Sequence, residues 1–315
     1  NAGKIIFAKI AGYRVSYIKI LGFLIDKSNG KAKIKFDILS FFELSLQFTP
    51  KDDDVKKNPK LIFLGGFIAE FILVVVALVL FFVLGFNQVK TTRSAIGWTA
   101  LFIMSYGFLT PLYEILPFRQ DFPTDMFNLL VTSNEEDKIA FNVVLINKKN
   151  EHAGKDYMPY EFENYDSFYK CRVLHANYLD HLYASRLEKA FNVLEEMRYY
   201  NKYLNDADRY LPYGEMIYLH FFINDDKGAD ATYLSMKKDD KKVVATPVLL
   251  SDYRTALLIA GLISSDSEKV KEIEAKFEKA TKEFGNEPSK RIAKEKELFM
   301  GAINKIKTTK PELHI

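Results

Sequence analysis

Apolar and polar residues alternate in the first part of the chain, and this spacing predicts β-structure. Between about residues 14 and 26, Val15, Tyr17 and Lys19 occupy alternate positions, so an extended backbone would place all three on one face. The dipeptide Asn29-Gly30 follows and is a strong signal for a tight hairpin turn. We therefore predict a small β-ribbon over about 14–38, which pairs roughly residues 14–26 with residues 31–38.

Two later stretches are apolar almost throughout and predict membrane spans. The first covers about residues 61–86 and contains one charged residue, Glu70. It is longer than the ~20 residues that a helix needs to cross the hydrocarbon core of a bilayer. The second covers about residues 96–116 and is close to the same length. Residues 41–58, which lie before the first span, are expected to form an exposed loop.

From about residue 156 onward the apolar positions follow the helical period of 3.6 residues. The predicted helices are connected by short breaks and cover about residues 167–183, 185–204, 209–224, 228–240, 248–263, 266–284 and 288–307. Consecutive helices with short connections suggest antiparallel hairpins similar to a tetratricopeptide array. The predicted fold class is therefore mainly α. Polytopic membrane helices with the small β-ribbon form a membrane domain at 1–150, and a soluble, repeat-like helical domain follows at 151–315.

Charge and cysteine content exclude several classes of function. The net charge of +3 is too small to indicate a nucleic-acid partner. A single cysteine, Cys171, excludes an internal disulfide and a thiolate metal site within one chain. Two predicted spans place the ribbon and the soluble domain on the same side of the membrane. That side carries more Lys and Arg, which favours the cytoplasm.

Three short segments carry candidate chemistry. The chain opens with Asn1-Ala2-Gly3-Lys4 and reaches Gly12-Tyr13 after an apolar helical stretch. Residues 63–70 read Phe-Leu-Gly-Gly-Phe-Ile-Ala-Glu, and residues 123–128 read Pro-Thr-Asp-Met-Phe-Asn. In this order around two apolar spans, they resemble the motifs of the site-2 protease family of intramembrane zinc metalloproteases. The resemblance covers about residues 1–147 and implies an ancestral zinc site.

The same segments depart from the family pattern at the positions that carry its chemistry. In the H-E-x-x-H motif, Asn1 takes the place of the glutamate and Lys4 that of the second histidine, while the first histidine would precede this chain. Asp125 matches the family's third zinc ligand. Catalytic zinc needs three protein ligands and a base, and a lysine ammonium has no lone pair to donate. We therefore expect no catalytic residue, no bound metal and no other cofactor.

The replaced positions suggest a charge cluster instead of a metal. Lys4 would lie near Asp125, with Glu70 as a further member, and a buried ammonium needs such a carboxylate partner. The alternative is that Lys4 faces water and has no partner. Glu70 also has two interpretations, because an intramembrane carboxylate is a functional candidate and this one is close enough to the end of the span to face water.

These observations predict a membrane-embedded pseudoprotease that binds a peptide or a membrane-protein partner, such as a transporter, without cleaving it. In the family that the chain resembles, a β-ribbon lies beside the active site and engages the substrate. Val15, Tyr17 and Lys19 are therefore the candidate peptide-binding residues. One alternative is an active zinc endopeptidase, if the motif is intact in the native protein. Another is a structural subunit of a membrane transporter complex. The soluble domain is expected in the cytoplasm.

Overall fold

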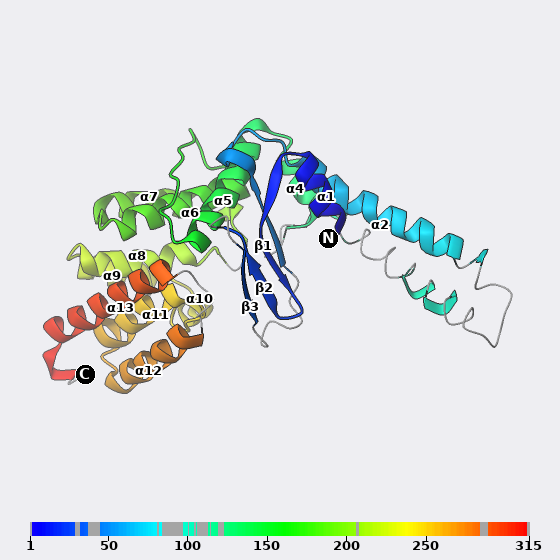
Figure 1. The fold of residues 1–315 in the computed structure, drawn as a ribbon. Coiled ribbons are helices and arrows are strands. Elements are labelled where there is room, and N and C mark those ends of the chain that lie inside the picture. Colours follow the sequence, from blue (N-terminus) through cyan, green and yellow to red (C-terminus); the bar gives the residue numbers. More distant parts are fainter. Residues whose placement is uncertain are drawn as a thin grey trace. The chain divides into compact units, whose positions relative to one another are not determined.

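The structure is a computed structural model of the 315-residue chain, drawn as a ribbon in Figure 1. It describes residues 2–28, 32–36, 45–80, 82–83, 97–99, 101–103, 105, 113, 115–118, 123–205, 208–283 and 289–313. The chain divides into two compact units, Asn1–Ile146 and Asn147–Ile315. The division lies within helix α5 (Glu135–Ala153), a few residues before the boundary near residue 150 that the sequence suggests.

The first unit begins with helix α1 (Ala2–Ile10), which turns at Gly12 into an antiparallel sheet. As far as it is described, the sheet has four strands in the order β3-β2-β1-β4. Their bounds are β1 (Tyr13–Ile20), β2 (Phe23–Asp26), β3 (Lys33–Phe36) and β4 (Ser45–Pro50). The register pairs Ile18 of β1 with Ile25 of β2 and with Leu46 of β4, and Ile25 in turn with Ile34 of β3.

The predicted two-stranded ribbon is therefore wrong in two respects. The chain already reverses at Leu21-Gly22, where both residues have positive φ (48° and 76°), the backbone of a tight hairpin turn. Asn29-Gly30 lies outside the residues that the structure describes, although β2 and β3 on either side of it pair as expected. The predicted loop at 41–58 contains β4, which completes the sheet by pairing with β1.

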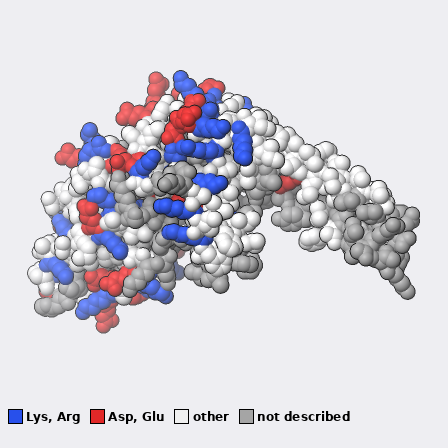
Figure 2. All heavy atoms as spheres, in the orientation of Figure 1, with Lys and Arg blue, Asp and Glu red and all other residues white. Residues whose placement is uncertain are grey.

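Helix α2 (Lys60–Leu80) follows a 3₁₀ turn at Lys51–Asp53. Many of its apolar side chains are exposed, including Phe71 and Ile72, and its surface is almost free of charge (Figure 2). Helix α4 (Asp125–Val131) and the first part of α5 complete the unit. Tyr13 lies at the centre of its core, where its hydroxyl donates to Asn142 Oδ1 at 2.7 Å.

The expectation of a polytopic membrane domain is contradicted. Within the described part of the chain, one helix, Lys60–Val79, is long and apolar enough to cross a membrane. The predicted second span at 96–116 lies largely outside the described residues, and the residues described at 97–99 and 101–103 are helical. Hydropathy alone predicted that span, although Gly97, Gly107 and Pro111 all disfavour a continuous helix. The fold is mainly helical with one small sheet.

The second unit is helical throughout its regular structure as described. Its helices are α6 (Phe168–Tyr183), α7 (Leu187–Tyr199), α8 (Leu211–Phe222), α9 (Asp226–Ser235), α10 (Lys238–Val244), α11 (Leu250–Leu258), α12 (Ser267–Glu283) and α13 (Ser289–Thr309). A π-helical turn at Ile259–Ile263 extends α11, and 3₁₀ turns lie at Asn201–Tyr203 and Pro311–Leu313. Most of these bounds follow the predicted helices, because each helix has an apolar face that packs into one core. The helix predicted at 228–240 is wrong: α9 ends at Ser235, the extended backbone of Met236 breaks the helix, and α10 begins at Lys238.

Among the described helices, three pairs form hairpins that close with the same turn. The pairs are α6–α7, α8–α9 and α11–α12, and the two helices of each pair pack together. Two residues after the first helix ends, each turn has one residue with left-handed backbone: Ser185, Asn224 or Ser265. The next residue donates its N–H back to the first helix, as in Arg186 N to His181 O at 2.9 Å. This is the Schellman arrangement that ends many helices. Cys171 of α6 is fully buried, and its thiol donates to Tyr165 O.

Candidate functional site

The first candidate site lies where α1 packs against α2 through glycine. A Cβ added to Gly3 would lie 2.4 Å from the carbonyl oxygen of Gly65, and one added to Gly65 would lie 2.5 Å from Phe7 Cβ. Real Cβ atoms do not approach that closely, so the two helix backbones are in direct contact. Small residues allow such contact between membrane helices. The packing fixes the position of Lys4, the residue that follows Gly3.

The structure brings Lys4 and Asp125 together. Lys4 Nζ lies 2.7 Å from Asp125 Oδ2, and the two side chains are 23% and 8% exposed. Asp125 is in the first turn of α4, where the helix dipole also favours a negative charge. Thr124 caps this helix by accepting a hydrogen bond from Phe127 N. Gly66 lies against the ion pair, because a Cβ there would be 2.8 Å from Lys4 Cε and 2.9 Å from Asp125 Oδ2.

The other candidate residues of this site are Asn1, at a degenerate motif position, and Glu70, expected in the charge cluster. Asn1 lies outside the residues that the structure describes. Glu70 is half-buried on α2, about one turn beyond Gly66. No group of three or more His, Cys, Asp or Glu side chains that could hold a metal ion occurs in the described ranges. With Lys4 held against Asp125, this arrangement does not suit zinc, since the ammonium offers no lone pair and occupies the side of the carboxylate that faces α1.

The expected peptide-binding residues do not offer a free strand edge. Tyr17 and Lys19 pair with β2 on one side and with β4 on the other, and Val15 pairs with Phe48 of β4. A strand adds to a sheet through unpaired backbone groups, so Tyr17 and Lys19 are excluded as the docking edge. Within the described sheet the outer strands are β3 and β4. All four residues of β3 are exposed.

The second unit contains a buried charge network that the sequence reasoning missed. Arg254 of α11 is fully buried, and its two terminal nitrogens bind Glu215 Oε2 of α8 at 2.6 Å and Glu295 Oε2 of α13 at 2.5 Å. Tyr178 of α6 donates to Glu215 at 2.5 Å, and Tyr183 of the same helix donates to Glu295 Oε1 at 2.8 Å. Burial raises the pKa of Glu215, and the charge of Arg254 opposes that shift. The network therefore connects four helices through one guanidinium.

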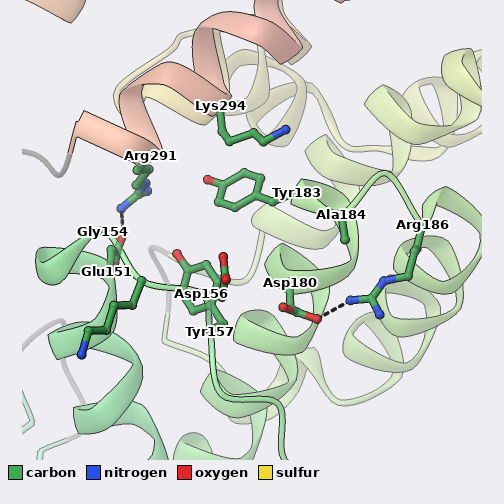
Figure 3. A pocket seen from close by; sticks show the side chains of 11 residues that line it. Glu151, Gly154, Asp156, Tyr157, Asp180, Tyr183, Ala184, Arg186, Arg291 and Lys294 are labelled. Atoms are coloured by element: carbon green, nitrogen blue, oxygen red, sulfur yellow. Dashed lines mark hydrogen bonds and ion pairs between the residues drawn. The ribbon is translucent and has the colours of Figure 1, made fainter.

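A cavity of about 430 Å³ lies beside this network, within the second unit. It is formed by the end of α5, the segment after it, the end of α6 and the start of α13 (Figure 3). The lining is mostly charged or aromatic: Glu151, Gly154, Lys155, Asp156, Tyr157, Asp180, Tyr183, Ala184, Arg186, Arg291 and Lys294. Arg291 is paired with Glu151 at one end, and Arg186 is paired with Asp180 at the other. Tyr183 belongs to both the cavity wall and the buried network.

Sequence patterns contained a weak signal for the network and a weaker one for the cavity. Arg254 and Glu215 each interrupt an otherwise apolar helical face, and a charge in such a position indicates a buried partner. Nothing in the spacing identifies which partner it is. The cavity depends on Gly154, whose left-handed backbone (φ 66°) ends α5 and turns the following residues toward α6.

Comparison of the chain with protein-family models, with curated proteins and with solved structures gives no match.

Proposed function

We propose that the chain is a membrane protein of the site-2 protease type that has lost zinc chemistry and binds a peptide or a membrane-protein partner without cleaving it. The observation that carries this proposal is the 2.7 Å ion pair between Lys4 and Asp125. Both residues lie at positions where the resembling motifs hold zinc ligands. In such a protein a permanent ammonium takes the place of the metal's positive charge and preserves the packing of α1, α2 and α4.

Two further features support a role in binding at a membrane. The apolar and largely exposed surface of α2 suits immersion in lipid, and we place the second unit on the cytoplasmic side of that membrane. In the described sheet β3 is an outer strand with exposed side chains, and it offers backbone groups to an extended polypeptide by strand addition. Its lysines, Lys33 and Lys35, favour a partner segment with acidic residues.

The role of the ion pair is tested by single and double substitution. Lys4→Met leaves the mostly buried Asp125 carboxylate without its cation, so we expect a loss of roughly 3 kcal/mol in the free energy of unfolding. Lys4→Met combined with Asp125→Leu should recover most of that loss, because neither charge remains. Lys9→Met on the exposed side of α1 is the matched control and should change little. Thermal unfolding of the detergent-solubilised full chain measures all four proteins.

Binding without cleavage needs its own experiment. A photo-crosslinking residue at Ile34 of β3 should form an adduct with an intact polypeptide in the protein's own membrane, whereas the same residue at exposed Leu234 of α9 should not. Metal content is measured on the same preparation. Stoichiometric zinc that is lost in Asp125→Asn, together with cleaved adducts, would show an active zinc endopeptidase and contradict the proposal.

A further inference from the structure

We propose that the cavity of the second unit binds a small organic anion. In this assignment Arg291 and Lys294 of α13 bind its carboxylate or phosphate group, and Tyr157 and Tyr183 contact its apolar body. The proposal concerns residues 147–315 only, so it stands or falls separately from the function proposed for the first unit.

The charges of the lining favour an anion. Four cationic side chains face three carboxylates, and two of the carboxylates, Glu151 and Asp180, are already paired with arginines. Asp156 is the third. Lys294 pairs at 2.8 Å with Glu297, whose side chain is 62% exposed, so a bound anion can replace that partner at small cost.

The geometry of α13 concentrates positive charge at one place. Arg291 and Lys294 are three residues apart, a spacing that brings two side chains to the same face of a helix. Arg291 lies in the first turn, where unpaired backbone N–H groups and the helix dipole add positive potential, and Lys294 lies in the second turn. In Figure 3 Arg291 lies on the hydroxyl side of Tyr183 with its guanidinium turned to Glu151, and Lys294 lies above the Tyr183 ring. An arginine's planar fork also suits the paired oxygens of a carboxylate or phosphate.

The aromatic wall and the volume indicate the size of the ligand. About 430 Å³ falls within the range of ~300–1,000 Å³ found for small-molecule sites. The rings of Tyr157 and Tyr183 lie with centroids 6.2 Å apart and planes tilted by 38°, and they provide a continuous apolar surface. Tyr183 is held by its hydrogen bond to Glu295 Oε1, so this wall is already in place before binding. Burial raises the pKa of Tyr183 well above its usual value, which keeps the hydroxyl a donor.

Ligand-observed saturation-transfer NMR on the detergent-solubilised full chain tests the assignment. The probes are phenyl phosphate and benzoate, with benzyl alcohol as the uncharged control; inorganic phosphate, the control without a ring, has no observable proton and is measured by competition with phenyl phosphate. We expect saturable binding of phenyl phosphate, of benzoate or of both, and the stronger probe identifies the anionic group. Benzyl alcohol and inorganic phosphate should bind at least about tenfold more weakly, because each lacks one of the two contacts.

Two variants of α13 separate a specific site from general attraction to a basic surface. Lys294→Gln removes a cation from the cavity without touching the Arg291–Glu151 pair, and should weaken binding of the stronger probe about tenfold. Lys296→Gln makes the same change on the exposed side of the helix and should leave binding unaltered. The proposal is overturned if neither anionic probe binds more tightly than benzyl alcohol, or if the two variants weaken binding equally.

Discussion

At the scale of single residues, the two charge clusters differ in how far the sequence could predict them. Lys4 and Asp125 each fell within a short motif, so their pairing was one of two interpretations before the structure placed them 2.7 Å apart. Arg254 had no such context, because neither it nor its partners Glu215 and Glu295 lie in a recognised motif. A charge on an apolar helix face indicates that a partner exists, but only the packing of the helices determines which residue it is.

Gly66 is the residue that leaves room for the first cluster, and it provides a direct prediction. In Gly66→Ala the new methyl group would lie 2.8 Å from Lys4 Cε and 2.9 Å from Asp125 Oδ2. We expect the ion pair to move apart and the free energy of unfolding to fall by about 1–3 kcal/mol, the usual cost of overpacking. Thermal unfolding of the full chain in detergent measures the loss.

Gly301→Ala is the matched control for that substitution. Gly301 is also helical, but a methyl group there would meet its nearest neighbours at 3.5 Å, an ordinary contact distance. This variant should be as stable as the native chain or more stable, since alanine favours helix over glycine by ~1 kcal/mol. If Gly66→Ala is also as stable as the native chain or more stable, the close packing around the ion pair does not contribute to the free energy of unfolding.

At the scale of elements, the sequence predicted the second unit well and the sheet only in part. The helical period located most helices from α6 to α13 because each has a polar face toward solvent and an apolar face toward one core, but it merged α9 and α10 into one helix. Strand β4 was missed because Asp52 and Asp53 directly after it made the whole segment resemble a loop. The reversal at Leu21-Gly22 was missed because leucine is unusual at a position that needs positive φ.

The shared hairpin turn predicts a stabilising substitution. Ser185 has φ 56°, and a residue with a Cβ is strained in this left-handed conformation by roughly 1 kcal/mol or more. Ser185→Gly removes that strain. We expect the free energy of unfolding to increase by about 1 kcal/mol, and the thermal midpoint of unfolding to rise with it. Ser185→Ala retains the Cβ and is the control, which should leave the midpoint unchanged or lower it. A midpoint that falls in the glycine variant would rule out strain at this turn.

At the scale of the whole molecule, the main correction concerns the membrane part. Two apolar stretches predicted two spans, and most of the second, 96–116, lies outside the described residues. In the described part of the chain only the helix Lys60–Val79 is long and apolar enough to cross a membrane. The division into two units was easier to foresee, since charged residues become frequent shortly before the boundary at Ile146 and Asn147.

The network around Arg254 connects four helices of the second unit, so we expect its removal to lower the stability of the whole unit. Arg254→Met leaves Glu215 and Glu295 buried without a cation, and we expect a loss of about 3–5 kcal/mol near pH 7. The pKa of Glu215 is already raised by burial and should rise further in the variant. A carboxyl group with a raised pKa in the folded state favours folding at low pH and loses that contribution as the pH rises.

The difference in thermal midpoint between the native chain and Arg254→Met should therefore shrink when the pH is lowered from 7 to 4.5. Thermal unfolding at both pH values measures it. Arg198→Met removes an exposed arginine of α7 and serves as the control, for which the difference should be small and independent of pH. A gap that stays constant or widens in acid would mean that the two glutamates do not take up protons in the variant.

The burial of Cys171 has a practical consequence for spectroscopy. It is the chain's one cysteine, its side chain is fully enclosed between helices, and its thiol is engaged with a backbone carbonyl. Thiol reagents reach only exposed thiolates efficiently. Fluorescent or paramagnetic labels can therefore be attached to cysteines introduced on the surface while the native residue stays in place. This 315-residue chain is ready for site-specific labelling without a cysteine-free background.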